Sequence, residues 1–220
     1  MLQLAWALFV LLLLTGTCAV LASGGKVHAA LLPLPLLSGA ALVLYGFGVA
    51  GALRLGAGLV FLLWAAVWVV GLVKLRPAGF AKACRETLTT PGIALFLGGA
   101  AFLWVLFFAL QPMFTQWDEF TAWGLAPKMV VERAAFYVAD PVNLKASFTY
   151  PATSLVTFLF QPFGAWAEWA CLAALDTLAL ACAAAATALP RQRWYSGVLV
   201  FAAGVLLPYF FRDPTPGAYA

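Results

Sequence analysis

The sequence predicts an all-α, polytopic membrane protein with about six transmembrane helices and a juxtamembrane helical outer loop. Hydrophobic residues make up 65% of the 220 residues and charged residues only 9%, whereas a soluble domain carries roughly a quarter charged residues. The mean hydropathy is +1.00. The apolar runs do not alternate with polar residues, so they predict helices, which satisfy their own backbone hydrogen bonds in lipid, rather than barrel strands.

Six segments are long enough to cross a bilayer, which takes about 20 predominantly apolar residues. In chain order they are Leu4–Ala22, Ala29–Gly51, Leu55–Val73, Pro91–Pro112, Trp166–Leu189 and Tyr195–Phe211. We expect a single transmembrane domain over 1–220, with four helices in 1–112, an outer loop in 113–164 and two further helices in 165–220.

Three connectors between these spans are basic: Ser23–His28, Leu75–Thr90 and Pro190–Arg193. The positive-inside rule places them on the cytoplasmic side, and it therefore places the 113–164 loop on the outer face of the cytoplasmic (inner) membrane. The net charge of +4 indicates contact with membrane lipids and no nucleic-acid partner.

The outer loop holds a charged island, because four of the chain's eight acidic residues fall between Thr115 and Pro151. Asp118 and Glu119 are adjacent and are flanked by Trp117 and Trp123. This acidic pair has two possible interpretations. The acids cap an interfacial helix and favour its positive end, or they form a general base or cation site at the lipid–water boundary.

Two lysines of this loop also carry alternative interpretations. Lys128 lies four residues before Glu132, and a surface ion pair is the ordinary outcome of that spacing. Lys145 has no acidic residue at helical spacing, so it is either a contact for a lipid phosphate or a solvated side chain whose stem lies along the membrane.

The stretch Tyr150–Gly164 is apolar but, at about 15 residues, too short for a comfortable span. We expect a juxtamembrane or re-entrant helix on the outer face that begins at Pro151, a favoured first helical residue. The sequence Pro162-Phe163-Gly164 is expected to end it.

Two acidic residues fall within or beside the fifth predicted span. Asp176 is in mid-span, where a charge costs about 3 kcal/mol on insertion scales, so we expect it to face the bundle. A structural hydrogen bond to Thr177 or a neighbouring helix and a role in proton or substrate binding are both open. Glu168, at the outer end, is expected to be solvated.

The chain has a single histidine, His28, and four cysteines without metal-ligand spacing. Histidine triads and multi-histidine sites are therefore excluded, and no metal site is predicted. Two adjacent carboxylates hold a divalent cation only where further ligands join them, so a divalent cation is an optional cofactor here.

Taken in order, WDEFTAWGLAPK followed by LKASFTYPATSL resembles the amino-terminal part of a GT-C superfamily membrane glycosyltransferase, in a bacterial branch with WDEF and Tyr-Pro motifs. The resemblance covers roughly Trp104 to Phe211. It implies a polyprenyl-phosphate-linked sugar donor and transfer of the sugar to an acceptor at the outer face. Ala152 stands where the family has a second proline, and such enzymes run to about twice this length.

The resemblance assigns roles to individual residues. Asp118 is the expected catalytic base, with Glu119 as its helper or as a cation contact. The expected substrate-binding residues are Lys128, Lys145, Tyr150, Trp117 and Trp123. Further C-terminal helices or a partner subunit are expected to complete the site. The alternatives are a non-enzymatic transporter or accessory membrane subunit, or an inactive fragment of a glycosyltransferase.

Overall fold

The computed structural model describes residues 1–114, 124–136, 151–188 and 198. Throughout this part every regular element is helical, which confirms the all-α class. Its elements are α1 (Leu2–Ala22), the 3₁₀ turn η1 (Ala29–Leu31), α2 (Pro33–Val49), α3 (Leu53–Leu88), α4 (Pro91–Leu110), α5 (Leu125–Arg133), α6 (Pro151–Phe160) and α7 (Glu168–Thr187).

Five described helical stretches are long and apolar enough to cross a membrane: α1, η1 with α2, α3, α4 and α7. They correspond to the first five predicted spans. The sixth predicted span, Tyr195–Phe211, lies outside the described residues except for Val198.

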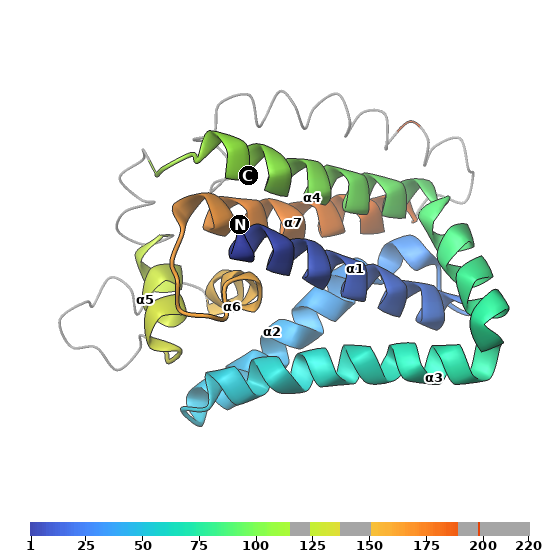
Figure 1. Cartoon of the computed structure of the whole chain (residues 1–220), viewed down its shortest axis with the longest axis horizontal. Helices are drawn as coiled ribbons and strands as arrows, with labels where there is room; N and C mark the ends of the chain where they lie inside the picture. Colours follow the sequence, from blue (N-terminus) through green and yellow to red (C-terminus); the bar gives the residue numbers. More distant parts are fainter. Residues whose placement is uncertain (115–123, 137–150, 189–197, 199–220) are drawn as a thin grey trace.

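The long helices form a bundle in which α4 packs against α7 and α1 packs against α3 and α4. In Figure 1 these helices run roughly alongside one another, while α2 crosses the bundle obliquely. Large side chains fill the centre, and those of Trp104, Phe96 and Phe107 are buried. Prolines begin α2 and α4, because a proline at the first helical position gives up no hydrogen bond.

Helix α4 approaches α7 closely at Gly92. A methyl group there would lie 2.6 Å from the side chain of Ala30 and would also contact the hydroxyl of Thr187. Only a residue without a side chain allows these helices to meet so closely, as is common where helices pack in membranes.

The turn between α2 and α3 differs slightly from the gap between the predicted spans Ala29–Gly51 and Leu55–Val73, which leaves Ala52-Leu53-Arg54 as the connection. Gly51 adopts φ +70°, a conformation that glycine reaches without steric cost. Helix α3 begins at Leu53, so Arg54 is already helical.

Helix α3 is longer than the predicted span Leu55–Val73, and it bends sharply. Pro77 lies inside it, and Arg76 has the non-helical angles φ 59° and ψ 162°. The proline removes a backbone donor and its ring clashes with the preceding turn, so the helix axis changes direction there. The predicted basic connector Leu75–Thr90 is therefore helical to Leu88, and this second segment crosses one end of the bundle (Figure 1).

Helix α6 begins at Pro151, as predicted, but it does not lie on the surface of the bundle. Seven of its ten residues, Ser154 to Phe160, are buried. It packs against α1, α2, α5 and α7, at the end of the bundle opposite the second segment of α3 (Figure 1).

Candidate functional site

The candidate site lies at the end of the bundle where α5, α6, the last turn of α4 and the first turn of α7 meet. We call this the α5–α6 end (Figure 1). Helix α5 packs on α6 through one buried face that includes Met129, Val130 and Val131. Its opposite face is exposed and carries Lys128, Glu132 and Arg133. Helix α5 therefore presents charge to solvent while its apolar face is fixed to the bundle.

Lys128 is the one predicted site residue that falls within the described part of the chain. Its side chain is exposed. The ion pair predicted between Lys128 and Glu132 is wrong for the described residues, where the ion pair observed is Lys82–Glu86 at 3.8 Å. The Lys128 ammonium is thus not tied to Glu132 and is accessible from solvent.

Glu168 was expected to be solvated, but its side chain is only partly exposed and has a hydrogen-bond partner. Its Oε2 accepts a hydrogen bond of 2.8 Å from the backbone N–H of Phe114. Phe114 is buried and its ring lies 6.1 Å from that of Trp166. The carboxylate joins the end of α4 to the first turn of α7, where an acid also favours the positive end of the helix.

The connection between α6 and α7 is held by side chains of α1 and by its own glutamine. Trp6 donates its indole N–H to the carbonyl of Leu159 at 3.2 Å, and the Gln3 amide donates to the carbonyl of Ala165. Gln161 Oε1 accepts the N–H of Ala167 at 2.9 Å. These hydrogen bonds provide partners for backbone groups that have no partner within a helix.

Buried polar side chains follow one face of α6. Ser154, Thr157 and Gln161 have i, i+3, i+7 spacing, and all three are buried, which places them on a single stripe. Thr157 lies 3.7 Å from the sulfur of Cys171 on α7. Ser154 Oγ and Gln161 Nε2 have no hydrogen-bond partner among the described residues.

Arg54 is a cation at this end to which the sequence analysis gave no role. A methyl group built on Gly164 would lie 3.8 Å from a guanidinium nitrogen of Arg54 and 3.8 Å from the carbonyl oxygen of Val131. The arginine at the start of α3 therefore reaches the turn after α6 and the last turn of α5. Because successive spans cross the membrane in alternating directions, the 50–52 turn is expected on the same side as the outer loop. This expectation was the sequence signal that could have pointed to Arg54.

Six predicted site residues lie outside the described residues: Trp117, Asp118, Glu119, Trp123, Lys145 and Tyr150. The described chain stops at Phe114 and resumes at Gly124, and it stops at Phe136 and resumes at Pro151. Phe114 is anchored by Glu168, and Phe136 packs on α2 against Tyr45 at 5.4 Å between ring centroids. Phe114 and Phe136, the described residues that precede these two stretches, are therefore fixed to the bundle.

Asp176 is the buried titratable group of the described bundle. It is 1% exposed on α7, and both of its carboxylate oxygens lack a hydrogen-bond partner among the described residues. The predicted structural hydrogen bond to Thr177 is therefore wrong, because the Thr177 hydroxyl donates to the carbonyl of Ala173. The functional alternative for Asp176 stays open.

Within the described residues, no three His, Cys, Asp or Glu side chains come together as metal ligands. The predicted acid pair, Asp118 and Glu119, lies outside them. Comparison of the chain with protein-family models, curated proteins and solved structures finds no match.

Proposed function

We propose that the chain is a membrane glycosyltransferase that moves a sugar from a polyprenyl-phosphate donor to an acceptor at the outer face of the membrane. The observation that carries the proposal is the order of features at the α5–α6 end. A span is followed by the WDEF stretch, a helix with one charged exposed face, the Lys145 stretch, a short buried helix that begins at Pro151, and another span. This order resembles the amino-terminal part of GT-C glycosyltransferases.

The proposed reaction is a direct displacement at the anomeric carbon of the donor sugar. The acceptor hydroxyl oxygen forms a bond to that carbon while the bond from the carbon to the phosphate oxygen breaks. Asp118 takes the acceptor proton as general base, with Glu119 beside it. The polyprenyl phosphate leaves as an anion, and cationic side chains that face the developing charge stabilise it. We assign this role to Lys145 and Lys128, with Tyr150, Trp117 and Trp123 as further substrate contacts.

Two observations at the α5–α6 end support this assignment. The Lys128 ammonium is exposed on α5 and is not paired with Glu132, so it is available to an anionic ligand. The end of α4 and the start of α7 are joined through Glu168, which holds the entry to the WDEF stretch in place. Catalytic groups need such a rigid support.

The test is release of polyprenyl phosphate from polyprenyl-phosphate sugars in membrane vesicles that contain the full chain. We expect Asp118→Asn to abolish release, because an amide cannot accept the proton. The matched control is Asp140→Asn, which removes a carboxylate from the same loop and is expected to leave release unchanged. Equal activity of Asp118→Asn and the unaltered chain would refute the assignment of the base.

A second candidate function rests on Asp176. A buried carboxyl without a partner inside a membrane bundle is typical of proton- or ion-coupled transporters. Its test is proton movement into proteoliposomes under an imposed potential. Loss of that movement in Asp176→Asn, together with retention in Asp118→Asn, would favour a transporter; the opposite pattern favours the transferase.

A further inference from the structure

An open cavity lies at the end of the bundle opposite the candidate site. Its volume is about 350 Å³, and it is lined by the C-terminal turn of α1, the loop 23–28 and the second segment of α3. Sites for small ligands typically begin at about this size. We call this end of the molecule the basic end, because Lys26, Lys74, Arg76, Lys82 and Arg85 are all exposed there.

The cavity combines a mainly apolar floor with a polar rim. Ala19, Ala83 and Thr87 are buried, whereas Ser23, His28 and Glu86 are exposed. It opens where α1 ends and α4 begins, and both are helices long and apolar enough to cross a membrane. The position is therefore that of the boundary between the hydrocarbon layer and the headgroups.

The rim offers hydrogen-bond acceptors to a cationic group. Ser23 donates its hydroxyl hydrogen to the carbonyl of Val20 at 2.6 Å, and Thr90 donates to the carbonyl of Glu86 at 3.2 Å. The hydroxyl hydrogens are thus engaged, and the remaining lone pairs can only accept. The C-terminal end of α1 and the Glu86 carboxylate add negative charge, which favours a cation.

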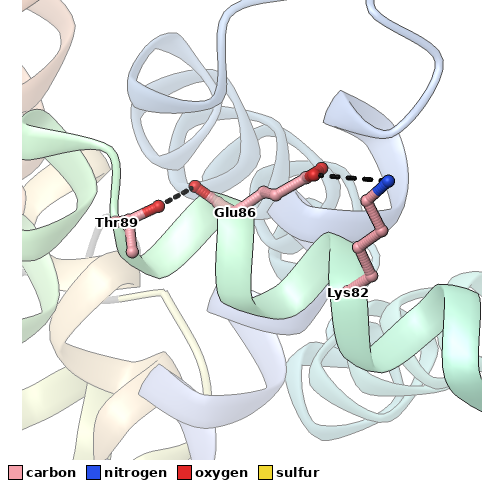
Figure 2. A network of polar contacts seen from close by, with 3 residues as sticks. All are labelled: Lys82, Glu86 and Thr89. Atoms are coloured by element: carbon pink, nitrogen blue, oxygen red, sulfur yellow. Dashed lines mark hydrogen bonds and ion pairs between the residues drawn. The ribbon is translucent and has the colours of Figure 1, made fainter.

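The rim and the turn of α3 beside it offer donors to an anionic group. His28 Nδ1 accepts the N–H of Ala30 at 3.3 Å, which leaves Nε2 as the donor nitrogen of the neutral ring. Figure 2 shows Lys82 and Glu86 pointing toward each other along one face of α3. Their 3.8 Å separation and exposed fractions of 76% and 67% leave both groups accessible to a third group.

An acid on the rim and a cation one helical turn before it complement a ligand that carries both charges. We propose that this cavity binds the headgroup of a membrane phospholipid with a primary ammonium next to its phosphate. The ammonium donates to Glu86 and to the hydroxyl oxygens of Ser23 and Thr90. The phosphate accepts from His28 Nε2 and Lys82, and the glycerol backbone lies toward the apolar floor.

The test is native mass spectrometry of the purified full chain with phosphatidylethanolamine, phosphatidylcholine or phosphatidylglycerol of identical acyl chains. Phosphatidylcholine keeps the phosphate but its quaternary ammonium has no N–H, so it serves as the matched lipid. We expect phosphatidylethanolamine to be retained at least about tenfold more than phosphatidylcholine, the low end of what one charge-assisted hydrogen bond contributes.

Glu86→Gln keeps an acceptor oxygen but loses the charge, so it is expected to reduce the preference for phosphatidylethanolamine over phosphatidylcholine and not to lower the retention of phosphatidylglycerol. The control is Glu132→Gln, which neutralises an exposed glutamate on α5 at the opposite end of the molecule and should change nothing. Because Glu86 is exposed, its variant is expected to unfold at the same temperature as the unaltered chain in detergent.

Three results would each overturn the proposal. They are equal retention of phosphatidylethanolamine and phosphatidylcholine by the unaltered chain, undiminished preference in Glu86→Gln, and strongest retention of phosphatidylglycerol. The last result would assign the basic end to anionic lipids. The comparison of lipids on the unaltered chain decides the question even if a variant does not fold.

Discussion

Trp104 on α4 donates its indole N–H to the hydroxyl oxygen of Thr177 on α7, at 3.0 Å, in the buried centre of the bundle. The Thr177 hydroxyl in turn donates a hydrogen bond to the carbonyl of Ala173, at 2.7 Å. The hydroxyl therefore has no hydrogen left for the neighbouring Asp176. The indole N–H of Trp104 and the hydroxyl of Thr177 therefore have hydrogen-bond partners, whereas the Asp176 carboxyl has none among the described residues.

We predict that Asp176→Leu stabilises the protein by about 1–3 kcal/mol, the cost of burying a polar group without a hydrogen bond. Leucine has the same number of side-chain heavy atoms with the same branching at Cγ, and it places no polar atom in the core. The measurement is reversible unfolding by SDS in mixed micelles. A loss of stability would mean that residues outside the described part supply a partner for Asp176.

Glu168→Ala is predicted to destabilise the junction of α4 and α7 by about 1–3 kcal/mol, because the part-buried N–H of Phe114 loses its acceptor. Glu168→Gln keeps an acceptor oxygen and is expected to retain most of the stability. Thermal unfolding in detergent measures both. Equal losses for the two variants would show that the negative charge, and not the hydrogen bond, is what matters.

Gly92 and Gly98 provide a matched pair on α4. Gly92→Ala is predicted to destabilise by about 1–3 kcal/mol, because its methyl group would overlap Ala30 and the Thr187 hydroxyl. A methyl group at Gly98 would have no neighbour within 4 Å. Gly98→Ala is therefore expected to be neutral or to gain up to about 1 kcal/mol from helix propensity. SDS unfolding of both variants checks the difference.

The backbone of Arg76 yields a prediction about strain. Its φ of 59° with ψ of 162° is a region that glycine adopts freely and that costs other residues about 1–3 kcal/mol. We expect Arg76→Gly to be more stable than the unaltered chain.

Arg76→Ala is the control for that prediction, because it also removes the charge but keeps a side chain at the strained position. Thermal unfolding of the two variants in the same detergent provides the comparison. If the alanine variant were as stable as the glycine variant, strain at this position would not explain the effect.

The parts of the fold that length and hydropathy determine were predictable. Five predicted spans have counterparts in the structure, and α6 begins at Pro151 as expected. The continuation of α3 beyond Pro77 was not predictable, because a proline in a basic stretch ordinarily marks a connector. Apolar composition also cannot distinguish a helix on the membrane surface from one packed inside the bundle, as α6 is.

The candidate site was only partly accessible to sequence reasoning. The position of Glu168 suggested solvent, but its partner is the N–H of Phe114, which the sequence could not place beside it. Arg54 was overlooked because its neighbours at the α5–α6 end, Gly164 and Val131, are far away in sequence. The motif residues Asp118 and Glu119 lie outside the described residues, so their assignment stays a prediction.

The burial of α6 has a consequence for how the protein is assembled in the membrane. This short helix contacts α1 and α2, which precede it by about a hundred residues or more, and α7, which follows it. Its apolar residues therefore find their final neighbours only after α7 has been synthesised and inserted. A chain halted before α7 therefore lacks part of the surface that buries α6, and its apolar side chains are exposed to chaperones and membrane proteases.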